Sequence, residues 1–116
     1  MTKYCFDIDG TICTNTEGDY ESAEPLAHAV DLVNELYSQG HSIILQTARG
    51  SVTKIDWRAT TERQLKDWRV NYHELYFSKP SADVYVDDKA ISAHSWHRER
   101  VDPLAILEMH KNKVET

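Results

Sequence analysis

Residues 3–10 read KYCFDIDG and hold the first regular pattern of the chain. Apolar side chains recur there at every second position, as in a β-strand that buries one face; they are Tyr4, Phe6 and Ile8. The pattern stops at Asp9-Gly10, a pair typical of a turn. The sequence therefore predicts a strand over residues 3–8 that ends in two closely spaced acids and a sharp turn.

Helical and strand patterns alternate along the rest of the chain, which indicates an α/β fold. We predict an α/β layer fold with a short parallel sheet. The stretch from Ile91 to Val101 shows no clear period and is not assigned. The predicted elements are a helix over Pro25–Gln39 with Pro25 near its first position and Gly40 at its end, a buried strand over Ser42–Gln46, a helix over Asp56–Trp68, strands over Glu74–Phe77 and Asp83–Val86, and a helix over Asp102–Lys111.

The length of 116 residues suits one domain, and 41% hydrophobic with 28% charged residues is ordinary for a globular fold. We expect a single domain with its core over about residues 3–90 and a helical tail over about 91–116. Two cysteines are too few for a disulfide framework, and Cys5 lies in an apolar run where a buried thiol is expected. No apolar run approaches the ~20 residues of a membrane span. We therefore expect a cytoplasmic protein with no membrane partner.

The net charge of −6 is unevenly distributed. Between Lys3 and Arg49 there is no Lys or Arg, whereas eight acidic residues lie there. A nucleic-acid-binding face would carry clustered basic residues, so this balance argues against a nucleic-acid partner and is compatible with a divalent cation. A solvated acidic surface is the simpler interpretation for Glu17 to Glu24.

Residues suited to chemistry collect where the predicted strands end. The carboxyl ends of parallel strands meet at one edge of a sheet, and there the chain places Asp7, Asp9, Thr47, Lys79, Asp87 and Asp88. Four carboxylates in one crevice repel one another unless a cation neutralises them, and oxygen ligands favour Mg²⁺ over zinc. A hydroxyl at Thr47 and an ammonium at Lys79 supply what a transferring phosphoryl group needs. The pattern indicates a magnesium-dependent phosphoryl-transfer site.

Each of these residues also has a simpler structural interpretation. Asp7 and Asp9 are then a solvated turn pair, and Thr47 caps the turn that follows it. Lys79 becomes a surface residue, and Asp87-Asp88 a turn with side-chain bonds to its own backbone. For three other residues we favour the simple interpretation: His94 and His97 as surface histidines, and Cys13 as a thiol that takes no part in chemistry.

The run Phe6-Asp7-Ile8-Asp9-Gly10-Thr11 resembles the first motif, DxDGT, of the haloacid dehalogenase (HAD) superfamily of phosphotransferases. Three further positions resemble the remaining motifs in the expected order over about residues 3–90. Thr47 resembles the second motif, Lys79 before a proline the third, and Asp87-Asp88 the acidic fourth. The resemblance implies a phosphatase with an aspartyl-phosphate intermediate. It also implies a Rossmann-like, three-layer fold with a short parallel sheet and helices on both faces, here with no cap domain.

By that resemblance Asp7 is the nucleophile, and Asp9 is the general acid of the first step and the base of the second. The implied Mg²⁺ ligands are the Asp7 carboxylate, the Asp9 carbonyl and an acid of the fourth motif. We favour Asp88 as the direct ligand, with Asp87 positioning water or Lys79. The residues expected to bind phosphate or substrate are Gly10, Thr11, Thr47, Ala48, Arg49 and Lys79.

The substrate is expected to be small and phosphorylated. The stretches from Asp9 to Thr47 and from Thr47 to Lys79 have no room for a cap, so the site admits a bulky substrate, or a neighbouring subunit of a homo-oligomer completes it. Short uncapped chains that look like this one occur among bacterial surface-polysaccharide proteins, which suggests a phosphosugar or related phosphoalcohol. The expected local determinants are the loop over residues 13–23, with Thr14, Asn15 and Tyr20, and the loop over residues 49–57, where Arg49 and Lys54 can hold a second anionic group.

Two alternatives stay open. One is a phosphatase of polymeric substrates, either a phosphoprotein or a nucleic-acid phosphate end. The other is a receiver-like signalling domain or a magnesium-binding scaffold without catalysis. The order of the motifs separates this chain from receivers, which place an acidic pair after the first strand and a lone acid after the third; here Asp-x-Asp comes first and the acidic pair follows Lys79.

Overall fold

The computed structural model describes residues 1–99, and their side chains as far as residue 97. The chain divides into two units, Met1–Ser81 and Ala82–Thr116. The first unit contains the whole sheet, two helices and a short 3-10 helix, η1 (Tyr20–Ser22). The described part of the second unit contains one helix. The expectation of a single domain with its core over residues 3–90 stays a prediction.

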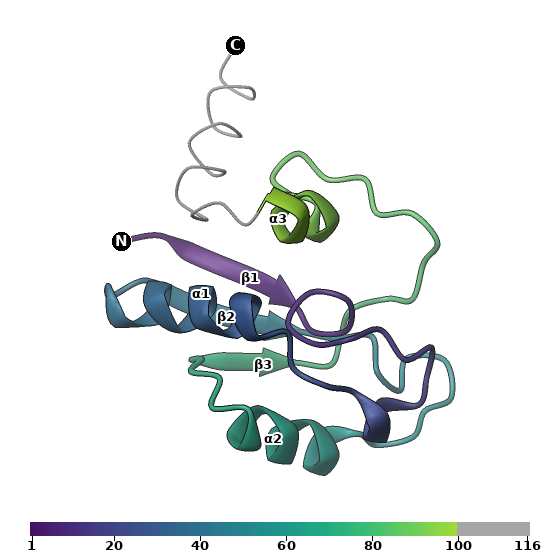
Figure 1. Ribbon diagram of the computed structural model, residues 1–116. Helices are drawn as coiled ribbons and strands as arrows, with labels where there is room; N and C mark the ends of the chain where they lie inside the picture. The colour runs from purple at the N-terminus through teal and green to yellow at the C-terminus, as the bar shows by residue number, and fades with distance from the viewer. Residues whose placement is uncertain (100–116) are drawn as a thin grey trace. The chain divides into compact units, whose positions relative to one another are not determined.

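The sheet has three parallel strands in the order β1-β2-β3 (Figure 1). They are β1 (Lys3–Asp7), β2 (Ser42–Gln46) and β3 (Glu74–Tyr76). In the register, Asp7 lies opposite Gln46, and Gln46 lies opposite Tyr76. The three carboxyl ends are therefore level, and the loops that leave them begin at one edge of the sheet.

Helix α1 (Ala27–Ser38) connects β1 to β2, and helix α2 (Arg58–Asp67) connects β2 to β3. Helix α1 buries an apolar stripe at helical spacing, formed by Ala29, Val30, Val33 and Leu36. Helix α2 differs, because its buried residues are Thr61, Gln64 and Leu65, of which two are polar. The sheet adds Ile43 and Leu45, and the loop after β1 adds Ile8 and Ile12, all fully buried. The core is thus apolar under α1 and partly polar under α2.

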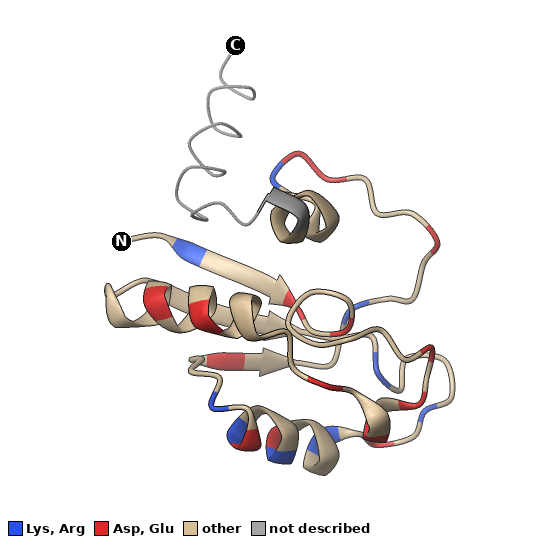
Figure 2. Cartoon of the chain, in the orientation of Figure 1, with Lys and Arg blue, Asp and Glu red and all other residues tan. Residues whose placement is uncertain are grey.

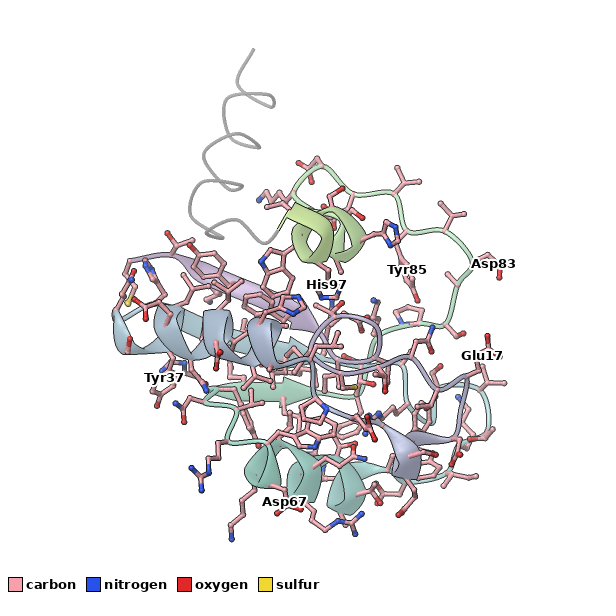
Figure 3. All side chains as sticks on the ribbon, viewed as in Figure 1. Glu17, Tyr37, Asp67, Asp83, Tyr85 and His97 are labelled. Carbon is pink, nitrogen blue, oxygen red and sulfur yellow. The ribbon has the colours of Figure 1, made fainter. Side chains whose placement is uncertain are left out.

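The two helices of the first unit also differ in charge (Figure 2). Acidic residues without basic ones mark the end of β1, the loop after it and α1, whereas α2 and its flanks carry basic and acidic residues together. Many of these side chains are solvent-exposed; Glu17, for example, projects outward from the ribbon (Figure 3). The basic residues of α2 are partly neutralised on the surface, since Arg58 pairs with Glu62 and Arg63 with Glu21.

The structure confirms the α/β class and the short parallel sheet. The described residues between Asp9 and Thr47, and between Thr47 and Lys79, form only the elements named above, with no cap domain. Gly40 ends α1 with φ +90°, as expected of a helix stop. Pro25 is not in the first turn of α1, because it forms an antiparallel bridge with Cys13. Cys5 is exposed rather than buried.

The predicted strand over Asp83–Val86 is wrong, because residues 77–92 contain no strand. The apolar residues of this run face solvent: Val84 is 75% and Val86 95% exposed. Its Tyr85 hydroxyl accepts a bond from the Ala82 amide, and the Asp83 side chain projects outward (Figure 3). A strand needs a partner for its backbone groups, and an apolar run cannot supply one.

The second unit is helical where the sequence showed no period. Helix α3 spans Ala93–Glu99, and the Trp96 amide donates to the Ser92 carbonyl. It carries His94 and His97, and the His97 ring stacks on Trp96. The predicted helix over Asp102–Lys111 lies outside the described residues. The second helical layer of the predicted three-layer fold stays a prediction, because α3 belongs to the second unit. In the described part of the chain, no helix has the length and apolar content needed to span a bilayer.

Replacing Gly50 by alanine is expected to destabilise the protein more than replacing Gly40. Both glycines have positive φ, so a side chain at either position costs about 1 kcal/mol in strain. A Cβ on Gly50 also collides with the backbone carbonyl of Ile55, whereas a Cβ on Gly40 meets nothing. Urea unfolding of Gly50→Ala and Gly40→Ala measures the difference, and equal losses would contradict the close approach at Gly50.

Candidate active site

The site is built first on an ion pair between Asp7 and Lys79. Asp7 is the last residue of β1, and Lys79 lies in the segment after β3. The Lys79 Nζ is 3.3 Å from the Asp7 Oδ1, and both side chains keep some exposure, 17% for lysine and 31% for aspartate. Because β1 and β3 are separated by β2, the lysine reaches across the carboxyl edge of the sheet. The structure thus brings together the predicted nucleophile and the predicted phosphate-binding cation.

Burial raises the pKa of the Asp7 carboxyl above its usual value. The charge of Lys79 and its hydrogen bond act in the opposite direction, and the nearby Asp9 adds a smaller upward effect. The folded protein therefore holds a proton on Asp7 more tightly than the unfolded chain does. Burial thus disfavours the anionic form of Asp7, and a bound cation would favour that form.

Asp9 forms a second, more deeply buried ion pair. The Arg49 Nε donates to Asp9 Oδ2 at 3.0 Å, and Nη2 donates to Oδ1 at 2.9 Å. The arginine side chain has no exposed surface, and the aspartate is 18% exposed. Two parallel bonds of this kind fix the plane of the carboxylate. Asp9 is therefore held in one orientation beside Asp7.

The turn after β1 brings Asp9 to this place. The Ile8 carbonyl accepts bonds from the amides of Thr11, Ile12 and Cys13, and the Gly10 amide donates to the Cys13 carbonyl. Gly10 has φ +84°, a conformation that L side chains rarely adopt, which explains glycine after the two acids. Gly10 and Thr11 thus form the turn itself, and their predicted contact with phosphate stays a prediction.

Arg49 makes bonds beyond Asp9. Its Nη1 donates to Thr61 Oγ1 at 2.9 Å and to Gln64 Oε1 at 2.7 Å, and its guanidinium lies over the Tyr20 ring at 4.7 Å. Burial lowers the Arg49 pKa, but the bond and charge of Asp9 outweigh it and leave that pKa raised. The anion that Arg49 binds in the structure is Asp9 of the same chain.

Thr47 follows β2 next to Asp7, because Asp7 lies opposite Gln46 in the register. Its amide donates to the Tyr76 carbonyl, and its Oγ1 accepts the Arg49 amide at 3.0 Å. This hydrogen bond is the one expected from the simpler structural interpretation of Thr47, in which its side chain caps the turn through Ala48. Thr47 is fully buried, and donation to phosphate by Thr47 and Ala48 stays a prediction.

Cys13, interpreted from the sequence as a thiol that takes no part in chemistry, is a neighbour of Asp9. Its Sγ is 3.5 Å from Asp9 Oδ1, and burial raises its pKa to about 12. A thiol with this pKa stays protonated, so Cys13 donates to Asp9 and packs beside it rather than acting as a nucleophile. Sequence reasoning missed Gln64. The available signal was two polar residues three positions apart, Thr61 and Gln64, on the inner face of α2.

Asp87 and Asp88 lie in the second unit, and the structure does not place that unit relative to Asp7. The Asp87 Oδ1 accepts a hydrogen bond from the Lys89 amide at 2.7 Å. This bond between a side chain and the nearby backbone is the one expected from the simpler interpretation of Asp87-Asp88 as a turn. Among the described residues, no three His, Cys, Asp or Glu side chains gather as metal ligands. The first unit still offers two oxygen donors of the kind that Mg²⁺ prefers, the Asp7 carboxylate and the Asp9 carbonyl. The two oxygens are of a chemical type that suits Mg²⁺, and the binding of Mg²⁺ stays a prediction.

The fold occurs in known structures. A structural-genomics target from Vibrio cholerae is similar to this chain with a TM-score of 0.81 and 21% identity, covering 97% of this chain and 99% of that one. Chains in two structures of the Pnkp1/Rnl/Hen1 complex, described in one of them as an RNA repair complex, match with TM-scores of 0.52 and 0.51 at 21% and 22% identity. Those matches cover 88% of this chain but only 34% and 32% of the larger chains. No protein-family model and no curated protein matches the sequence. At these identities the likeness establishes the fold alone.

Replacing Arg49 by methionine is expected to destabilise the protein by about 3–5 kcal/mol, because it leaves a partly buried carboxylate without its partner. Arg63→Met is the matched control. Arg63 pairs with Glu21 at 3.5 Å on the surface, and losing such a pair costs about 0.2–1 kcal/mol. Chemical denaturation gives both values. If Arg49→Met lowers the free energy of unfolding no more than Arg63→Met does, the Arg49–Asp9 pair does not stabilise the fold.

Asp7→Asn is expected to make the protein more stable at neutral pH. Since the Asp7 pKa is raised in the folded state, the stability it contributes is present at low pH and lost as the pH rises through that pKa. The gain over wild type should therefore shrink as the pH falls toward about 4. Urea unfolding with a chelator present measures it, with Asp31→Asn on the exposed side of α1 as control. A gain that is independent of pH would contradict this account.

Proposed function

We propose that the chain is a Mg²⁺-dependent phosphomonoester hydrolase of the HAD type, with Asp7 as its nucleophile. The observation that carries the proposal is the pairing of Asp7 with Lys79 at the carboxyl edge of the sheet, beside a second acid fixed by a buried arginine. A structural scaffold gains little from a partly buried carboxylate whose pKa burial raises. A nucleophile that meets a phosphate dianion needs this combination of an acid and a cation.

In the first step, an Asp7 carboxylate oxygen attacks phosphorus while the bond from phosphorus to the ester oxygen breaks. For this step Asp9 carries a proton on a lone pair that its two bonds from Arg49 leave open, and it gives that proton to the departing alkoxide. The Lys79 ammonium stabilises charge on the phosphoryl oxygens. In the second step, water attacks the aspartyl-phosphate, Asp9 takes the water proton, and the Asp7–phosphorus bond breaks to release phosphate. Asp9 thus ends each cycle as it began.

The proposed ligands of Mg²⁺ are the Asp7 carboxylate, the Asp9 carbonyl and Asp88, with Asp87 as the alternative acid. When bound, the ion reduces repulsion between the nucleophile and the phosphate. The chain's own contribution is the arrangement already described: β1 supplies Asp7 and the following turn Asp9, while Arg49 keeps Asp9 from rotating away. Asp88 must come within ligand distance of Asp7 for this proposal to hold.

The proposed substrate is a phosphosugar or related small phosphoalcohol, and a nucleic-acid phosphate end is the second candidate. Supporting the first are the resemblance of the sequence to surface-polysaccharide phosphatases and the acidic residues around the site. Supporting the second are the fold shared with chains of an RNA repair complex and a site without a cap. A site of this kind accepts either an open polymer end or a small ester, so the substrate must be measured.

A screen of phosphorylated sugars, sugar acids, alcohols, phosphopeptides and nucleic-acid ends with Mg²⁺ tests the function. Wild type is expected to release phosphate, and Asp7→Asn to lose about 10³-fold or more of kcat/KM. Asp88→Asn is expected to require more Mg²⁺ than Asp87→Asn, and Asp31→Asn to match wild type. If Asp7→Asn turned over substrate as fast as wild type, the covalent mechanism would be wrong. If phosphate were released only from nucleic-acid ends, those ends would replace the phosphosugar as the proposed substrate.

A further inference from the structure

Helix α2 buries polar residues where a helix of this fold would ordinarily bury apolar ones. Thr61 is fully buried and Gln64 is 7% exposed, and they lie one turn apart on the same face. Burying an amide or a hydroxyl costs free energy unless it forms hydrogen bonds. A leucine at position 64 would avoid that cost, so the glutamine calls for a reason beyond packing.

Both ends of the Gln64 amide are bonded to residues around Asp9. Its Oε1 accepts from Arg49 Nη1 at 2.7 Å, and its Nε2 donates to the Tyr20 carbonyl at 2.7 Å. An amide side chain of this length can accept at one end and donate at the other. Gln64 therefore links α2 to the loop that carries η1, and it links both to the guanidinium that holds Asp9.

We propose that Gln64 is a positioning residue that acts on Asp9 through Arg49. The guanidinium is a rigid plane, so fixing its Nη1 edge with Gln64 and Thr61 also fixes the Nε and Nη2 edge that faces Asp9. The Tyr20 ring covers the face of the same plane. Gln64 also keeps Tyr20 in place, because the Gln64 Nε2 donates to the backbone carbonyl of Tyr20. The orientation of the Asp9 carboxylate thus depends on a residue of α2 that does not touch it.

The chemical consequence rests on the proposed function and concerns the proton that Asp9 donates. An alkyl phosphate expels a basic alkoxide, which leaves only if it is protonated, and a poorly oriented Asp9 slows that step. A 4-nitrophenyl phosphate expels a weakly basic phenolate that leaves without a proton. Loosening Arg49 should therefore harm the first class of ester and spare the second.

The test compares kcat/KM of Gln64→Met for an alkyl phosphate from the screen and for 4-nitrophenyl phosphate, with Mg²⁺ present. Methionine keeps the length of the side chain but neither hydrogen bond. We expect the alkyl value to fall by about 10²-fold, through kcat rather than KM, and the aryl value to stay near wild type. The ratio of the two values does not depend on how much of the variant is folded.

Thr61→Val and Gln39→Met complete the design. Thr61→Val removes the other acceptor of Arg49 Nη1 with little change in shape, and it should shift the ratio in the same direction, even if Gln64→Met fails to fold. Gln39 is an exposed residue bonded to Glu35, so Gln39→Met should leave both values unchanged. Equal loss on both esters in Gln64→Met and Thr61→Val would overturn the inference and leave the proposed function standing. No turnover of any ester by wild type would instead overturn the function itself.

Discussion

The bidentate pair of Asp9 and Arg49 is the constraint on which the rest of the site depends. It joins the turn after β1 to the loop after β2, and through Thr61 and Gln64 it extends into α2. Removing two charges from water is costly, and the cost is offset only when every donor finds an acceptor. That requirement accounts for the polar inner face of α2 and for the close packing of Cys13 and Tyr20 around the guanidinium.

Much of the first unit could be predicted from local sequence patterns. Alternation over residues 3–8 identified β1, the apolar run Ser42–Gln46 matched β2 at both ends, and the stripe that includes Val33 identified α1. The rule that parallel strands end at one edge also brought Asp7 and Lys79 together correctly, since each follows directly from where its strand stops. These predictions held because periodicity and strand polarity are properties of short segments.

The remainder depended on contacts between distant positions. The run Asp83–Val86 has the composition of a strand, but composition does not supply a neighbouring backbone to pair with. From the sequence, Arg49 was expected to bind an anionic group of a substrate. Only the tertiary fold shows that its guanidinium binds Asp9, which lies forty positions earlier in the chain. Gln64 gave no signal beyond being polar on a helix, because its two partners come from separate loops. The roles of Thr47, Asp87 and Asp88 stay predictions.

The reach of Lys79 across the carboxyl edge has a consequence for how the protein is made. The ribosome synthesises β1 and the two acids at its end, Asp7 and Asp9, well before the segment that follows β3. The Asp7–Lys79 pair therefore cannot form until almost the whole first unit has been synthesised. Contacts between such distant positions close late in folding, after the intervening loops have lost their freedom. The half-made chain therefore has its acids but lacks the lysine, and the Asp7–Lys79 pair forms only once the sheet is complete.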